Sequence, residues 1–138
     1  MGRIFGIIQV DGKRFRTLFD SGSTNTYVTD EVAKKFKRSR LLVPRTTGIG
    51  GRRRRSVETC ELTGKLEGKT IEMEAYILDE IGQDEKGRPI EILLGAHAMQ
   101  KWSIVLVPKE ERVDLSHYPE EFIEFSEMPP APRRKVGR

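Results

Sequence analysis

Residues 18–28 read LFDSGSTNTYV, and the aspartate at position 20 decides how the whole segment is interpreted. An apolar stretch ends on Asp20, and a carboxylate beside Leu18 and Phe19 is costly to desolvate unless something satisfies it. Small residues follow at once, and Gly22 would let other groups approach the carboxylate closely. Asp20 is therefore either an ordinary turn residue at a strand end or a group positioned for chemistry.

The length and composition of the chain indicate a single globular domain. Its 138 residues have a low hydrophobic fraction of 36% and a high charged fraction of 33%. The apolar residues fall in short clusters, which is typical of a β-rich protein and not of a disordered chain. No apolar run approaches the roughly 20 residues that cross a bilayer, and the N-terminal residues lack the pattern of a signal peptide. We therefore expect a cytoplasmic protein with no membrane partner.

Few side chains have metal-binding or nucleophilic chemistry. Cys60 is the single cysteine, which excludes an intramolecular disulfide, and we expect it to fill space in the core. His97 and His117 are the two histidines, and their spacing does not suggest a metal site. We therefore expect neither a metal nor a cofactor.

Two β-hairpins are predicted from their turn residues. Apolar-rich stretches at 4–10 and 13–19 flank Asp11-Gly12, a pair that favours a type I′ turn, and the second stretch leads directly into Asp20. A second hairpin is expected for 59–66 and 70–78, around the turn Glu67-Gly68-Lys69. Its second strand has apolar residues at alternate positions, namely Ile71, Met73 and Ala75.

The remaining segments are shorter. We expect a brief strand near 27–28, a helix at 31–36 capped by Thr29 or Asp30, and a polar loop at 79–89. Pro44 should limit any strand around it, and the glycines that follow should form a flexible turn. A buried strand at 91–95, a helix at 96–102 and a final strand at 103–107 complete the predicted elements.

Four features of the chain, taken in order, resemble the retropepsins, the single-domain aspartic proteases typified by retroviral proteases. They are the hairpin IIQVDGKRFRTLFDSG at 7–22, TTGIGG at 46–51, the strands CELTGKLEGKTIEMEAYIL at 60–78, and Leu93-Leu94-Gly95 followed by a short helix and SIVLV at 103–107. This resemblance implies an all-β, mostly antiparallel closed barrel with a flap hairpin and one or two short helices. The protease domain would span residues 1–108, and 109–138 would form an extension that is partly helical or disordered and rich in Pro and Arg at its end.

The resemblance also assigns roles to residues. Asp20 would be the catalytic carboxylate of an aspartic endopeptidase, with Ser21 and Gly22 completing its loop. The flap tip, which closes on the polypeptide substrate, would consist of Gly48, Ile49, Gly50 and Gly51. An apolar ridge beneath the catalytic loop would consist of Leu93, Leu94 and Gly95.

This chemistry needs two carboxyl groups. One takes a proton from water while the other donates a proton to the carbonyl oxygen of the peptide bond. The chain carries one DSG segment, so the second carboxylate must be Asp20 of an identical partner related by a two-fold axis. Thr24 and Ala96 stand where retroviral enzymes carry an acid and an arginine that pair near this axis. We therefore expect other contacts to hold the homodimer together.

Two other functions stay open. The chain could be an inactive retropepsin fold that serves as a dimerisation or binding module. It could also be a small basic nucleic-acid binder that uses Arg52–Arg55 and the basic residues at 133–135, although no aromatic ladder accompanies them and nucleic acid is not our expected partner. In a protease, the four arginines would face solvent or attract acidic residues near the cleavage site. Tyr118-Pro119 resembles the aromatic-Pro junctions that retroviral proteases cut, which makes self-processing there a further hypothesis.

Overall fold

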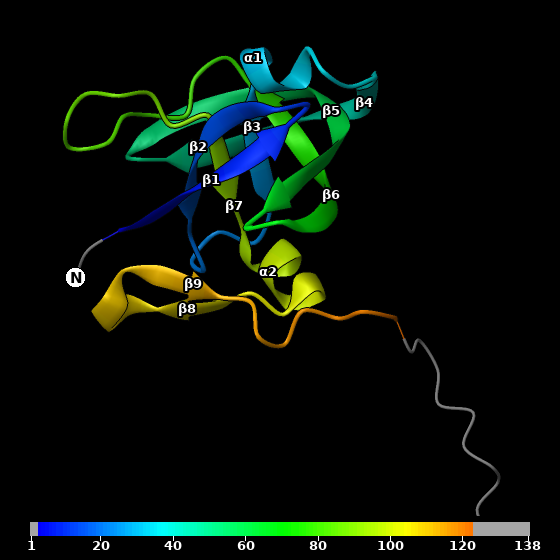
Figure 1. Ribbon diagram of the computed structural model, residues 1–138. Coiled ribbons are helices and arrows are strands. Elements are labelled where there is room, and N and C mark those ends of the chain that lie inside the picture. Colours follow the sequence, from blue (N-terminus) through cyan, green and yellow to red (C-terminus); the bar gives the residue numbers. More distant parts are fainter. Residues whose placement is uncertain (1–2, 123–138) are drawn as a thin grey trace, which may run out of the picture.

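The computed structural model describes residues 3–122, and Figure 1 shows the path of the chain. The strands are β1 (Ile4–Val10), β2 (Lys13–Phe19), β3 (Thr26–Thr29), β4 (Arg38–Ile49), β5 (Arg52–Leu66), β6 (Lys69–Leu78), β7 (Ile92–Leu94), β8 (Val105–Val107) and β9 (Arg112–Asp114). The helices are α1 (Asp30–Ala33), α2 (Ala96–Trp102) and a 3₁₀ helix (Pro108–Glu110).

Six of these strands close into a barrel. Neighbouring strands follow the order β1-β2-β7-β3-β6-β5, and β5 pairs again with β1 where Leu66 lies opposite Ile8. The β2–β7 and β3–β6 pairs are parallel, whereas the other pairs are antiparallel. β4 lies outside the ring and pairs with β5. The predicted fold class, an all-β and mostly antiparallel closed barrel with short helices, is confirmed.

Both predicted hairpins are confirmed, and their turns have the expected backbone. Asp11 and Gly12 have φ angles of 51° and 79°, and Glu67 and Gly68 have φ angles of 49° and 83°. Two successive positive φ angles define the type I′ turn, whose twist matches that of the strands it joins. The first hairpin therefore delivers β2, and with it Asp20, to a fixed place on the barrel.

The expectation that Pro44 limits the strand around it is wrong. β4 runs through Pro44 from Arg38 to Ile49. Its pairing with β5 is irregular between Arg40 and Arg45, where the register shifts. Proline has no N–H for a ladder hydrogen bond, but an edge strand with a bulge tolerates this loss.

The two predicted helices differ in outcome. The helix predicted at 96–102 is confirmed as α2. The helix expected at 31–36 is shorter, since α1 ends at Ala33, and the Thr29 side chain that precedes it makes no capping hydrogen bond. No helix within residues 3–122 combines the length and the apolar character that would let it cross a membrane.

Two groups of buried side chains pack inside and beside the barrel. The larger group includes Ile8, Phe15 and Leu62, which have no exposed surface. The alternate residues Ile71, Met73 and Ala75 of β6 are buried in it, as their spacing predicts. The smaller group supports the cleft described below and consists of Leu18, Tyr27, Leu78, Ile81, Ile90 and Leu93.

The chain beyond α2 folds back onto the domain. β8, within the predicted strand at 103–107, is not the final strand, because it pairs with β9 and the Val113 side chain of β9 is buried. The predicted boundary after residue 108 thus falls between two paired strands. Residues 123–138, the rest of the expected extension, lie outside the described residues.

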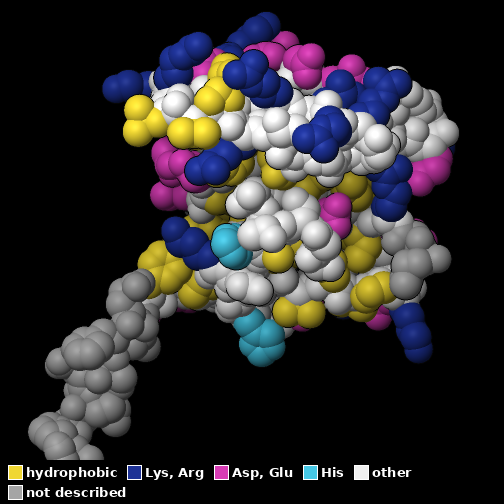
Figure 2. Space-filling model, turned by 180° about the vertical axis from the view of Figure 1, so that it is seen from behind, with side chains coloured by type: hydrophobic (Ala, Val, Ile, Leu, Met, Phe, Trp, Pro, Cys, Tyr) yellow, Lys and Arg dark blue, Asp and Glu magenta, His cyan; other side chains and the backbone are white. Residues whose placement is uncertain are grey.

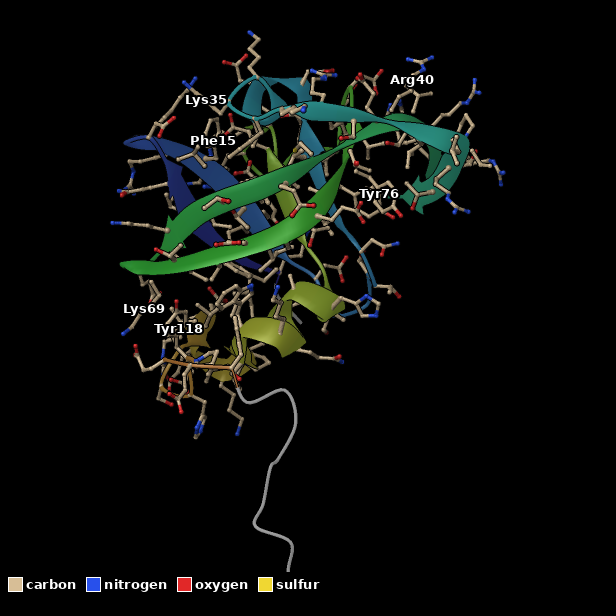
Figure 3. All side chains as sticks on the ribbon, turned by 90° about the vertical axis from the view of Figure 1, so that its right-hand side faces the viewer. Phe15, Lys35, Arg40, Lys69, Tyr76 and Tyr118 are labelled. Carbon is tan, nitrogen blue, oxygen red and sulfur yellow. The ribbon has the colours of Figure 1, made fainter. Side chains whose placement is uncertain are left out.

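Tyr118 holds the last described segment against the barrel. Its ring stacks on Trp102 with 5.7 Å between the ring centroids, and its hydroxyl donates a hydrogen bond to the carbonyl oxygen of Thr70 at 2.7 Å. Figure 3 shows Tyr118 beside Lys69 at the start of β6, and the Lys69 Nζ lies 5.2 Å from the centre of the Tyr118 ring. The Tyr118–Pro119 bond therefore lies in a packed segment, and self-processing there stays a prediction.

Candidate active site

Asp20 follows the last residue of β2 and is held by hydrogen bonds on both sides. Its backbone N–H donates to the carbonyl oxygen of Leu94 at 2.9 Å, which continues the parallel pairing of β2 with β7. The Gly22 N–H donates to the Asp20 Oδ1 at 2.9 Å and orients the half-buried carboxylate. A Cβ on Gly22 would lie 3.2 Å from this oxygen, so a side chain there would crowd the carboxylate.

The loop after Asp20 is fastened to the start of α2. The N–H groups of Ala96 and His97 donate to the carbonyl oxygens of Ser23 and Thr24 at 2.6 Å and 3.1 Å. Backbone hydrogen bonds therefore join the loop residues Ser23 and Thr24 to the first turn of α2.

Gly95 is required where this loop crosses β7. A Cβ at position 95 would lie 2.1 Å from the carbonyl oxygen of Asn25, a distance that no side chain tolerates. The Gly95 N–H also donates to the Thr26 Oγ1 at 3.1 Å. The close approach of the Gly95 backbone to Asn25 therefore fixes the position of the loop that follows Asp20.

The hairpin of β4 and β5 covers the Asp20 loop. Its turn consists of Gly50 and Gly51, whose φ angles of 58° and 78° repeat the two successive positive φ angles of the other two hairpin turns. Ile49 and Gly50 line the same cavity as Asp20. The Tyr27 hydroxyl lies 3.0 Å from the Thr47 Oγ1, so a hydrogen bond joins β3 to β4 beside this cavity.

Two pockets meet at Asp20 and share Ile49, Gly50 and Leu93. The first has a volume of about 370 Å³ and is polar, with Ser23, Thr24, Asn25 and Thr47 among its lining residues. The second has a volume of about 560 Å³ and is bordered by Arg3, Arg52 and Arg54. A cleft of this size on either side of one carboxylate can hold an extended peptide segment.

The structure brings most of the sequence-predicted site residues together. The cavity at Asp20 is lined by Asp20, Gly22, Gly48, Ile49, Gly50 and Leu93. Gly51 lies in the hairpin turn, and Leu94 is fully buried beneath the loop, where it pairs with Phe19. Ser21 is exposed and borders a different, apolar groove next to α2.

Comparison with known proteins identifies the family. A family model described as Aspartyl protease matches residues 7–98, about two thirds of the chain. The chain belongs to the aspartyl protease family. A search of curated protein sequences finds no match for this aspartyl protease family member.

Solved structures give the same answer for the fold. The retroviral protease-like domain of Ddi1 from Leishmania major aligns with a TM-score of 0.60 at 13% identity, over 84% of this chain and 90% of that domain. The EIAV protease, solved with the inhibitor HBY-793, aligns with a TM-score of 0.54 at 20% identity, over 77% of this chain and 93% of that protein. This aspartyl protease family member therefore has a retropepsin-like fold.

The sequence analysis did not identify Asp84, the residue that anchors the 79–89 loop at the cleft of this family member. Asp84 is buried, and its Oδ1 accepts hydrogen bonds from the N–H groups of Lys86 and Arg88, both at 2.9 Å. Its Oδ2 lies 2.6 Å from the Arg16 Nε of β2 and accepts a hydrogen bond from the Arg88 Nε at 2.9 Å. The pattern Asp84-Glu85-Lys86-Gly87 carried the signal, because Asp at the first and Gly at the fourth position are typical of a type I turn.

Burial and hydrogen bonding act in opposite directions on Asp84. Desolvation by burial raises the pKa of this carboxyl, but the backbone hydrogen bonds from Arg88 and Lys86 and the Arg88 guanidinium outweigh it and lower the pKa to about 2. Asp84 is therefore ionised at neutral pH and acts as a structural anion, not as a proton donor.

The remaining reactive groups of this family member do not form a second site. Cys60 is buried, and desolvation raises the pKa of its thiol to about 11, which opposes a nucleophilic role. Within residues 3–122, no three His, Cys, Asp or Glu side chains gather in a way that could hold a metal ion.

Proposed function

We propose that this protein is a homodimeric aspartic endopeptidase in which Asp20 carboxylates from two copies of the chain activate a water molecule. One observation carries the proposal. Asp20 is the only carboxylate lining the polar pocket beneath the glycine hairpin, among the residues that the structure describes, and a hydrogen bond from the Gly22 N–H orients it. The family match supports peptide hydrolysis as the reaction.

The proposed reaction needs both carboxyl groups in different protonation states. The ionised Asp20 takes a proton from water, and the oxygen of that water attacks the carbonyl carbon of the peptide bond. The protonated Asp20 of the second copy donates its proton to the carbonyl oxygen. The tetrahedral gem-diol then breaks its C–N bond while one of its hydroxyl groups returns a proton to the carboxylate of the second copy. The amine leaves with a proton from the first carboxyl. Two titrating groups this close share their apparent pKa values as a pair.

The glycine hairpin is proposed to act as a flap. Gly48, Ile49, Gly50 and Gly51 lie at its tip above Asp20, where backbone N–H groups can reach a substrate carbonyl. Glycine leaves the backbone free to approach a ligand closely. The catalytic unit in this proposal is the predicted domain, residues 1–108, together with the segment that packs on it.

A groove beside the catalytic loop is the proposed contact with the second copy. It has a volume of about 650 Å³ and is lined mainly by apolar residues of α2 and the segment that follows it, namely Ala96, Met99, Ile104, Val105 and Leu106. Ser21 borders it, and its hydroxyl makes no hydrogen bond to any described residue, which leaves it free to bond across the interface. A second copy is the expected occupant because the carboxyl pair is incomplete without it.

Mixed dimers test the proposal. The native protein should cleave apolar peptides best at acidic pH and be blocked by a pepstatin-type inhibitor, and Asp20→Asn should abolish cleavage. When native and Asp20→Asn chains are mixed in equal amounts and allowed to exchange, only about one quarter of the dimers keep two aspartates, so activity should fall to about half of the undiluted value per native chain. Asp11→Asn, a matched change in the distant β1–β2 turn, should leave activity unchanged. Cleavage that persists in Asp20→Asn, or activity that does not respond to mixing, would overturn the proposal.

A further inference from the structure

The larger pocket at Asp20 combines a basic rim with an apolar floor. Arg3, Arg52 and Arg54 border it, and Glu80 is the one acidic side chain beside Asp20 among its described lining residues. The floor is formed by Leu18, Ile81, Ile90 and Leu93. This pocket therefore carries more positive than negative charge, directly next to the proposed catalytic carboxylate.

The strand geometry of β5 divides its run of four arginines between two faces. Side chains alternate along a strand, so Arg52 and Arg54 lie on one face and Arg53 and Arg55 on the other. Arg53 and Arg55 border a second pocket, together with Arg54. That pocket also contains Asp30, Glu58 and Asp79, of which Asp30 and Glu58 pair with Arg38, a further lining residue, at 2.8 Å. Figure 2 shows Lys and Arg side chains gathered over the upper part of the molecule, where α1, β4 and β5 lie in Figure 1.

The arginines at the Asp20 pocket are poorly paired within the described residues. Arg54 is largely buried, with 15% of its side chain exposed, and its Nη2 lies 3.6 Å from the Glu80 Oε2, which is too long for a hydrogen bond. Its Nε is buried and has no hydrogen-bond partner. Arg52 has no acidic partner within ion-pair distance among residues 3–122.

Arg3 adds a third positive charge from the other side of the pocket. Its Nη1 lies 3.9 Å from the Glu85 Oε2, and both side chains are largely exposed, so this contact holds the guanidinium weakly. Arg3 and Arg52 are exposed, whereas Arg54 is partly buried. A partly buried guanidinium group without an acceptor gains most from a carboxylate, which can accept two N–H groups of one arginine. The guanidinium groups of this pocket thus have no close anionic partner among the described residues, and an anionic ligand can supply one.

We propose that this pocket binds an acidic side chain, Asp or Glu, of the polypeptide substrate. The inference rests on the proposed function and adds the class of substrate to it. The substrate carboxylate would contact Arg52 and Arg54, while an adjacent apolar side chain would lie on Leu93 and the floor around it. Because the two-fold axis repeats the pocket, an acidic residue on either side of the scissile bond finds the same surroundings.

Peptide binding to the inactive dimer tests this inference without relying on catalysis. Short peptides with an apolar central pair would carry one Glu at each flanking position in turn, and each would be matched by a peptide with Gln at that position. Binding to Asp20→Asn would be measured by fluorescence anisotropy at about pH 6, where a substrate Glu is ionised. At one or more positions we expect the Glu peptide to bind about tenfold more tightly than its Gln partner, and added salt should reduce the ratio.

Variants of β5 give matched controls. In the Asp20→Asn background, Arg52→Gln should clearly reduce the preference for the Glu peptide over the Gln peptide. Arg53→Gln and Arg55→Gln remove the same charge from the opposite face and should keep the preference. Equal affinity of every Glu and Gln pair, no binding of either peptide, or an equal loss from all three variants would overturn the inference. A single-stranded oligonucleotide that displaced the Glu peptide would also overturn it and assign the arginines to nucleic acid.

The two proposals can fail separately. If the native protein cleaves Gln peptides as fast as Glu peptides, and Asp20→Asn cleaves neither, the proposed function stands and the inferred substrate class is wrong. If Asp20→Asn prefers Glu peptides but the native dimer cleaves nothing, the binding pocket stands and the proposed catalysis fails.

Discussion

The Tyr27 hydroxyl lies 3.0 Å from the Thr47 Oγ1, and this contact joins the strand after the Asp20 loop to the strand that leads into the glycine hairpin. Tyr27 is itself buried under the cleft, packed against Tyr76 with 5.8 Å between the ring centroids. The hairpin is therefore connected to the floor of the cleft by a side-chain hydrogen bond as well as by the β4–β5 ladder. This arrangement makes the position of the hairpin depend on a residue next to the site.

Tyr27→Phe should loosen the hairpin over Asp20. It removes one hydrogen bond, which contributes about 1 kcal/mol, and keeps the buried ring. We expect a Michaelis constant for peptide substrates that is about fivefold higher, since 1 kcal/mol corresponds to roughly that factor. Thr47→Val should give a similar increase, and the double variant should add little to either single change. Fully additive effects would show that the two hydroxyls do not act as a pair.

Gly95→Ala should destabilise the fold. The added Cβ would meet backbone atoms of the loop, with the carbonyl oxygen of Asn25 at 2.1 Å, and no side-chain rotation relieves this contact. We expect a loss of about 3 kcal/mol or more in the free energy of unfolding, measured with urea. Gly48→Ala is the matched control, because nothing lies within 4 Å of its Cβ position, and it should change stability by less than about 0.5 kcal/mol.

Asp84→Asn should lower the melting temperature in a pH-dependent way. The folded-state pKa of Asp84, about 2, lies below its ordinary value of 3.8, so its ionised form stabilises the fold above that value. This contribution is lost as the pH falls from about 4 towards 2, and the melting temperatures of native and variant protein should converge there. Asp79→Asn, an exposed position on the same loop, should melt like the native protein throughout. A difference that stayed constant down to pH 2 would contradict the role assigned to the Asp84 charge.

The segment after residue 108 should contribute to stability. Tyr118→Phe removes the hydrogen bond to the Thr70 carbonyl and should cost about 1 kcal/mol in the free energy of unfolding. Tyr118→Ala also removes the ring that stacks on Trp102 and should cost about 1 to 3 kcal/mol. Chemical denaturation monitored by tryptophan fluorescence would measure both. Unchanged stability in Tyr118→Ala would mean that the packed segment adds nothing to the domain.

Local chemistry explains which elements were predictable. Asp11-Gly12 and Glu67-Gly68 specify their turns through backbone angles that few other pairs adopt, and both hairpins form as expected. Pro44 misled the prediction because its missing N–H matters only where a ladder bond is required, and the irregular pairing of β4 removes that requirement. β9 was missed because its three residues have no periodic pattern, and the strand depends on pairing with β8.

The candidate site likewise has features that the local sequence predicts and features that only the folded chain creates. The placement of Asp20 at a strand end and of the glycine hairpin follows from short stretches of sequence. The Tyr27–Thr47 hydrogen bond and the contact of Arg16 with Asp84 join residues 20 or more positions apart, and only the closed barrel brings them together. The division of Arg52–Arg55 between two faces needed the strand assignment of β5, because a charge run has no faces until its backbone conformation is known.

The pairing of β8 with β9 has a consequence for how working enzyme would be produced. The two-stranded sheet of β8 and β9 forms within one chain, so neither subunit of the proposed dimer needs a strand from the other to complete this sheet. Such subunits can part and rejoin as folded bodies, and their association obeys mass action. The local concentration of the chain would then determine how many assembled cleavage centres exist. Dilution would lower their number by dissociating the dimer, and accumulation of the chain would raise it.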